Sequence, residues 1–200
     1  IGATFFGVDN YRSGWDGGVE LGKWIKANWQ GRIDKLIVLE HTSGGTLPAM
    51  RLTGQVEGLQ SVIGDIAEAD TIRLDDASVS HDTEKVLLLQ LESLPGARKL
   101  AVISISDNTA EAIVNAARKS GRTDHIATAA QGAGTRLVRS ELRKAHSVIV
   151  AATLFRPEKY GRPLIELAQK ILRGEQAPPA VYIKHVVVDR NNIGDYYPDN

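Results

Sequence analysis

The 200-residue chain contains no cysteine. That absence excludes disulfide frameworks, zinc sites built from thiolates, and cysteine nucleophiles. It does not indicate a compartment, because a cysteine-free chain suits the periplasm and the cytoplasm equally.

Net charge and long apolar runs are also absent. The chain carries 24 basic and 24 acidic residues, so its formal net charge is zero. A globally basic nucleic-acid-binding protein is therefore disfavoured, and we expect no direct nucleic-acid binding by this chain. No apolar stretch is long enough to span a bilayer, and no targeting signal opens the sequence.

Catalytic and cofactor motifs are missing as well. The sequence contains no G-x-S-x-G, H-E-x-x-H or P-loop lysine motif, and its five histidines are scattered without metal-ligand spacing. The segment Gln131-Gly132-Ala133-Gly134 resembles a dinucleotide-binding turn, but Leu137 stands where the third glycine would fall. We therefore expect no cofactor, no metal and no enzyme activity. An enzyme on a doubly wound sheet remains the weakest alternative.

What the sequence does contain is a regular alternation of short apolar runs with longer helical patterns. This rhythm predicts an α/β fold, with a parallel sheet flanked by helices. The run Leu100-Ala101-Val102-Ile103 is continuously apolar, as buried parallel strands are. The predicted strands lie near 3–8, 34–40, 69–74, 98–104, 124–130, 147–153 and 181–188.

Three of the predicted helices carry further information. In 11–28, the glycines Gly14, Gly18 and Gly22 predict close packing of the helix on a sheet. The helix 107–120 has an apolar face and a glycine stop just after it. The helix 157–173 places Leu164, Leu167 and Ile171 on one apolar face.

Polar groups gather in loops where ligands of open α/β sheets bind, beyond the carboxyl ends of the strands. The loop 41–46 could cradle an anion, but a flexible loop with Thr46 as helix N-cap is the favoured interpretation. Arg51 offers a rigid fork of donors to hydroxyls or a carboxylate, although taken alone a surface arginine is the favoured interpretation. Asp107 could accept hydrogen bonds from hydroxyls or cap helix 107–120, and the two roles are compatible.

Several motifs, taken in order, resemble one protein family. They are Val8-Asp9-Asn10, the segments 49–54 (AMRLTG) and 106–112 (SDNTAEA), the stretch from Tyr160-Gly161 to Gly174-Glu175, and the tail from Val188 to Pro198. Together they resemble type I periplasmic sugar-binding proteins of the ribose-binding kind and the effector domains of lac-repressor-like regulators. The likeness covers essentially the whole chain, aligned to the family from its first interlobe hinge onward.

The resemblance implies a ligand-binding role for eight positions. Arg51 matches the arginine that forks onto sugar hydroxyls. Ser106 stands where the family commonly has a ligand-binding asparagine, with Asp107 beside it, and Gln131 stands where a strand-end aspartate is usual. The remaining positions are Val8 beside a hinge, Thr42 in a ligand-contacting loop, Ser80 near an often aromatic position, and Phe155 (or Thr153) at the second hinge crossing.

The departures from the family pattern bear on the ligand. Gln131 and Ser106 replace stronger hydroxyl-binding groups, while Ser80 and Ala130 lack an aromatic face that could stack on a sugar ring. Each lost charge-assisted hydrogen bond would weaken binding of an ordinary pentose by roughly 1.5–3 kcal/mol. A different sugar, a sugar derivative or another small polyol-like molecule is therefore expected.

The same resemblance implies a domain plan and a function. Residues 1–154 would form the C-terminal lobe of a two-lobed fold, 155–180 would belong to the other, largely absent lobe, and 181–200 would return to the first. Ligand would bind between the lobes by hinge closure, and the apolar face of helix 157–173 would be exposed unless something covers it.

The first hypothesis is the solute-binding component of an ABC-type sugar importer. It would partner a membrane permease and be periplasmic or extracellular-facing. The alternative is the effector domain of a cytoplasmic lac-repressor-like regulator, which would reach operator DNA through an upstream domain.

Overall fold

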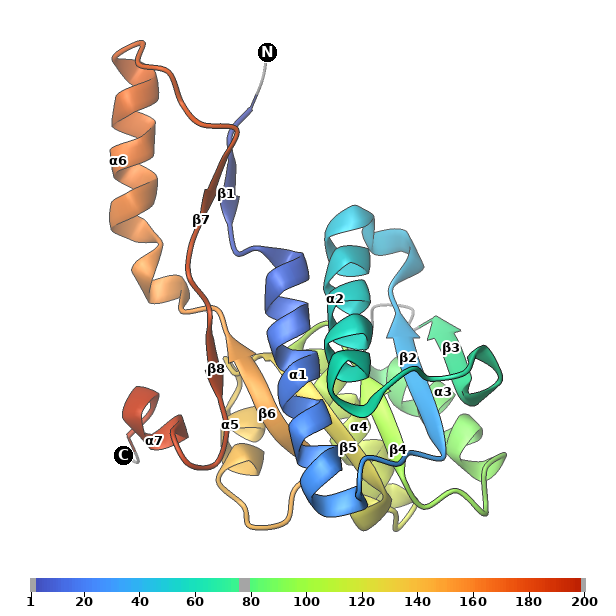
Figure 1. Ribbon diagram of the computed structural model, residues 1–200. Coiled ribbons are helices and arrows are strands. Elements are labelled where there is room, and N and C mark those ends of the chain that lie inside the picture. Colours follow the sequence, from blue (N-terminus) through green and yellow to red (C-terminus); the bar gives the residue numbers. More distant parts are fainter. Residues whose placement is uncertain (1–2, 76–79, 199–200) are drawn as a thin grey trace.

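The computed structural model describes residues 3–75 and 80–198, without the side chains of 80 and 81. Its main feature is a six-stranded sheet in the order β3-β2-β4-β5-β6-β8, parallel except for the antiparallel pair β6–β8 (Figure 1). The predicted α/β class with a parallel sheet is confirmed. The strands are β2 (Lys35–Glu40), β3 (Thr71–Asp75), β4 (Leu100–Ile103), β5 (Ile126–Gly132), β6 (Ile149–Leu154) and β8 (Val186–Val188).

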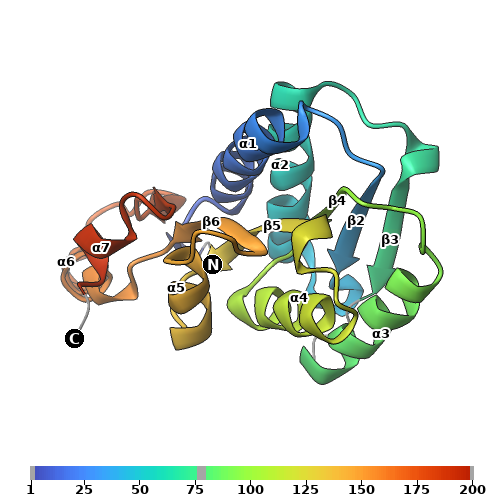
Figure 2. The same cartoon turned by 90° about the horizontal axis from the view of Figure 1, so that it is seen from below.

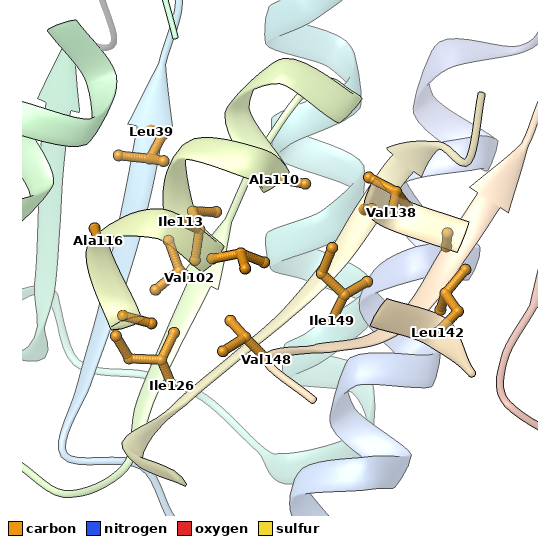
Figure 3. Close-up of a cluster of buried hydrophobic side chains, with 14 of the residues drawn as sticks. Leu39, Val102, Ala110, Ile113, Ala116, Ile126, Val138, Leu142, Val148 and Ile149 are labelled. Atoms are coloured by element: carbon orange, nitrogen blue, oxygen red, sulfur yellow. The ribbon is translucent and has the colours of Figure 1, made fainter. Parts of the chain in front are cut away.

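Helices cover both faces of this sheet. Figure 2 shows α1 (Asn10–Trp29) and α2 (Thr46–Ile63) on one side, and α3 (Ser80–Glu92), α4 (Asp107–Lys119) and α5 (Arg136–Leu142) on the other. All four residues of β4 are buried, which explains its continuous apolar run. Figure 3 shows one of the two cores, in which Val102, Ile126 and Ile149 of the sheet meet Ile113 of α4.

The two helices α1 and α2 pack through glycines on both partners. A Cβ added at Gly14 would lie 2.1 Å from the Arg51 carbonyl oxygen, and one at Gly18 would lie 2.1 Å from that of Gln55. Gly54 and Gly58 of α2 face the α1 backbone in the same way. The prediction that Gly14, Gly18 and Gly22 pack α1 on a sheet is therefore wrong, because all three face α2.

A smaller part of the chain extends away from this body (Figure 1). It consists of the parallel pair β1 (Phe5–Gly7) and β7 (Ala180–Tyr182), the 3-10 turn Pro157–Lys159, and α6 (Gly161–Leu172). We call these elements the extension and the rest of the described chain the main body, which ends in the short α7 (Ile193–Tyr196). The predicted single strand 181–188 is wrong, since its two halves join different sheets.

The apolar face of α6 is largely exposed, as the sequence predicts. Leu164 is 47% exposed, Ile171 49% and Leu172 86%, although Leu167 is buried at 8%. The division into lobes at 1–154, 155–180 and 181–200 stays a prediction. Among the described residues, no helix is both long and apolar enough to cross a membrane.

Candidate functional site

Arg51 joins three elements at the carboxyl end of the sheet. Its Nη2 donates to Asn10 Oδ1 at 2.5 Å, and its Nη1 donates to the Ile105 carbonyl at 2.6 Å. Its Cζ lies 4.8 Å from the centroid of the Phe155 ring, a cation–π distance. Arg51 thus connects the start of α1, the segment after β4 and the segment after β6. Arg51 and Phe155, two of the predicted ligand-binding residues, are therefore in contact, and their role in binding stays a prediction.

The guanidinium of Arg51 has only neutral partners. Burial lowers its pKa, and nearby Tyr160 acts in the opposite direction. Its Nε is buried and has no hydrogen-bond partner within the described part of the chain. No carboxylate of the described residues pairs with it, so its charge is not balanced by an acidic neighbour.

Asp107 holds the loop between β5 and α5. Its carboxylate accepts backbone N–H bonds from Ala133 at 2.8 Å, Gly134 at 2.6 Å and Thr135 at 3.1 Å. Burial raises the pKa of Asp107, and these three hydrogen bonds oppose that rise. Both carboxylate oxygens are therefore engaged within the chain, and the role of Asp107 as a hydroxyl acceptor stays a prediction.

This arrangement also accounts for the glycine-rich segment after β5. A Cβ at Gly132 would lie 2.7 Å from Asp107 Oδ1, so only glycine lets the loop approach the carboxylate. Ala133 adopts a left-handed conformation, with φ of 57°, and its N–H points to Asp107. The backbone N–H groups of residues 133–135 thus bind the Asp107 carboxylate.

The start of α4 is capped by Ser106. Its Oγ accepts from the Thr109 N–H at 3.3 Å, while Thr109 Oγ1 accepts from the Ser106 N–H at 3.0 Å, forming a capping box. The prediction that Asp107 caps this helix is therefore wrong, because Asp107 is its first residue. The cap expected from Thr46 is wrong as well: α2 begins at Thr46, and Gly45 precedes it without a side-chain cap.

Gln131 lies at the end of β5 beneath α1. The side chain is 2% exposed, and a Cβ at Gly17 would come within 2.7 Å of its Nε2 and 3.1 Å of Thr153 Oγ1. Neither polar atom of its carboxamide is hydrogen-bonded within the described residues. Thr153 in turn donates to the Ser13 carbonyl at 3.1 Å. Gln131 therefore lies at the carboxyl end of its strand, as predicted, but its side chain is buried between β5 and α1.

The other predicted positions are more dispersed. Val8 is buried between β1 and α1, and its carbonyl accepts from Asn10 Nδ2 at 3.4 Å. Thr42 donates to Asp75 Oδ2 at 2.5 Å, near the outer edge strand β3. It lines a 520 Å³ pocket against Ala49 and Thr53, on a different face of α2 from Arg51. Ser80 begins α3, and its side chain lies outside the described residues.

Two residues of this region were not among the predicted site positions. Asn10 is only 7% exposed and fixes Arg51 through its side-chain oxygen. Its place in the Val8-Asp9-Asn10 motif was the available signal. Tyr160 lies near the same guanidinium. Burial raises the pKa of Tyr160, and the charge of Arg51 opposes that rise. The two place the start of α1 and the segment before α6 beside Arg51.

Comparison with known proteins identifies the fold. No protein-family model and no curated protein sequence matches the chain. Among solved structures, the chain is similar to an ABC transporter periplasmic solute-binding protein from Actinobacillus succinogenes 130z with bound D-allose. The TM-score is 0.80 and the identity 18%, over 98% of this chain and 65% of that protein. The chain has the fold of periplasmic sugar-binding proteins.

Two further structures support this fold assignment. A solute-binding protein from Agrobacterium vitis with bound allitol gives a TM-score of 0.77 at 20% identity, over 96% of this chain and 64% of that protein. The arabinose-binding component of an ABC transporter from Shewanella sp. ANA-3 gives 0.75 at 17% identity, over 97% and 61%. The chain therefore spans less than two thirds of each of these sugar-binding proteins.

Proposed function

We propose that this chain forms one wall of a cleft that binds a small sugar or polyol without transforming it. The supporting observation is the Arg51 cluster, in which Asn10, the Ile105 carbonyl and Phe155 hold a donor-rich guanidinium where open α/β sheets bind ligands. The similar structures from A. succinogenes and A. vitis contain D-allose and allitol. The proposed ligand is, like these two, a small molecule rich in hydroxyl groups.

The proposed setting is an ABC-type sugar importer, with the chain as part of its solute-binding component. The protein would face the periplasm or the outside and would deliver ligand to a membrane permease. This setting is supported by the description of the A. succinogenes and A. vitis proteins as ABC transporter solute-binding proteins. Hinge closure would act through the three segments that join the extension to the main body, near residues 8, 155 and 184 (Figure 1).

The test is calorimetry on the complete gene product with a panel of D-allose, allitol and L-arabinose. Arg51→Ala should weaken binding of whichever ligand is recognised by roughly 10- to 100-fold, as expected for lost charge-assisted hydrogen bonds. Arg162→Ala, which removes the same charge from the exposed surface of α6, should leave affinity unchanged. Circular dichroism would show that both variants remain folded.

The outcomes separate the site from the function. Unchanged affinity in folded Arg51→Ala would remove Arg51 from the binding site. Failure of the complete gene product to bind any neutral, acidic or reduced sugar would overturn the proposed function. We also expect the isolated 200-residue chain to bind sugars poorly, because it would supply one wall of the cleft.

A further inference from the structure

The charges near Arg51 bear on the chemical class of ligand. The one acidic residue among the predicted site positions, Asp107, directs both carboxylate oxygens to three backbone N–H groups of the β5–α5 loop. Gln131 and Ser106 are uncharged. The guanidinium is therefore the uncompensated charge among these predicted ligand-binding residues, and it is partly withdrawn from water.

A second buried arginine serves as an internal control. Arg122 is 8% exposed and donates to the carbonyls of Leu91, Leu94 and Ala97, which lie at and just beyond the C-terminal end of α3. A helix C-terminus carries partial negative charge, so it compensates a guanidinium without any carboxylate. Arg122 is thus a structural cation.

Arg51 lies in the opposite kind of field. Its partner Asn10 is the first residue of α1, and Ile105 directly precedes the N-cap of α4. Helix N-termini carry partial positive charge, so these surroundings add to the charge of Arg51. One N–H of each terminal nitrogen is used in these contacts and Nε is buried, so the second N–H of Nη1 and of Nη2 remains for a ligand.

Resting on the proposed sugar-binding function, we infer that the ligand is a sugar acid, an aldonate or uronate whose carboxylate pairs with Arg51. A carboxylate matches the planar fork of a guanidinium and accepts two parallel hydrogen bonds. It also supplies a negative partner for Arg51, which pairs with no carboxylate of the described residues. The hydroxyl groups of the same molecule suit a sugar-binding fold.

The experiment compares matched pairs by calorimetry on the complete gene product. D-Galacturonate is compared with D-galactose, and D-gluconate with D-glucitol. In at least one pair the acid should bind with an affinity about 10-fold higher, or more, than that of its neutral partner. The reason is that hydrogen bonds between a guanidinium and a carboxylate are stronger than those between a guanidinium and a hydroxyl. The methyl ester of D-galacturonate keeps the shape without the charge and should bind no better than D-galactose.

Variants assign the preference to Arg51. Arg51→Gln should abolish the difference between acid and neutral sugar, whereas Arg51→Lys should retain part of it because the charge remains. Arg162→Gln on the exposed α6 is the matched control and should leave the preference intact. If Arg51→Gln does not fold, Arg51→Lys tests the assignment to Arg51, and the methyl ester comparison on the unaltered protein tests whether the carboxylate charge is recognised.

Each outcome has one meaning. Neutral sugars that bind as tightly as their acids would overturn this inference and leave the proposed sugar-binding function standing. An acid preference that survives Arg51→Gln, or an ester that binds like the acid, would also overturn it. If no compound of this panel binds, and D-allose, allitol and L-arabinose do not bind either, the proposed function itself is rejected.

Discussion

The main body and the extension are built from similar sequence patterns but differ in what covers their apolar residues. The main body buries large side chains on both faces of its sheet, including Leu21 and Ile113 at 0% exposure. The extension has a two-stranded ladder and one helix, whose Leu172 is 86% exposed. Two strands alone are marginal in water. An apolar stripe therefore predicts which face of a helix is apolar, but not whether other residues of the same chain bury that face.

The largest expected contrast comes from truncating one buried and one exposed side chain. Ile113→Ala in the main body should lower the free energy of unfolding by about 2–5 kcal/mol, because it leaves a cavity in a closed core. Leu172→Ala in the extension should change it by less than about 0.5 kcal/mol. Urea unfolding followed by circular dichroism measures both. A large loss in Leu172→Ala would mean that α6 is covered in solution.

A smaller contrast comes from adding one methyl group to a glycine in each part. Gly18→Ala should destabilise by about 1–3 kcal/mol, because the new Cβ would fall 2.1 Å from the Gln55 carbonyl oxygen. Gly161→Ala meets nothing within 4 Å and should be neutral or stabilising by up to about 1 kcal/mol. Equal effects in the two variants would show that the α1–α2 contact can relax.

The same contrast explains how much the sequence could predict. The strands β2 and β4 were located well, because continuous apolar runs reflect burial on both faces. The segment 181–188 has an equally clear strand pattern, yet its halves pair with β1 and β6 in different sheets. Which strand a segment pairs with depends on distant parts of the chain, and local pattern does not contain that information.

Site prediction met a similar limit. The position of Arg51 on α2 followed from the sequence, but its partners Asn10 and Ile105 come from elements far along the chain. Asp107 had the right residue type for binding hydroxyls, and its carboxylate is engaged by a loop 26 to 28 residues away. Residue type predicts what a group can bind, whereas the fold decides whether that group is already occupied.

A hydrogen bond between the segment leading to the extension and the main body gives a third, smaller expected effect on stability. His185, in the link between β7 and β8, contacts Asp16 of α1 at 2.8 Å, and Arg12 pairs with the same carboxylate. His185→Gln should change overall stability by less than about 1 kcal/mol, since a single side-chain hydrogen bond contributes little. It should still speed hydrogen exchange in the β1–β7 ladder relative to β4. Unchanged exchange in that ladder would show that this contact does not hold the extension.

The smallest effect is a pH dependence confined to the main body. Burial, and then the neighbouring charges of Arg98 and Arg122, lower the pKa of His125. The unfolded chain therefore binds this proton near pH 6.5 while the folded chain resists it, so acidification through that region favours unfolding. His125→Asn should reduce the loss of stability between pH 7.5 and pH 5.5, measured as the shift in urea midpoint. An equal shift in wild type and variant would assign the pH dependence to another titratable group.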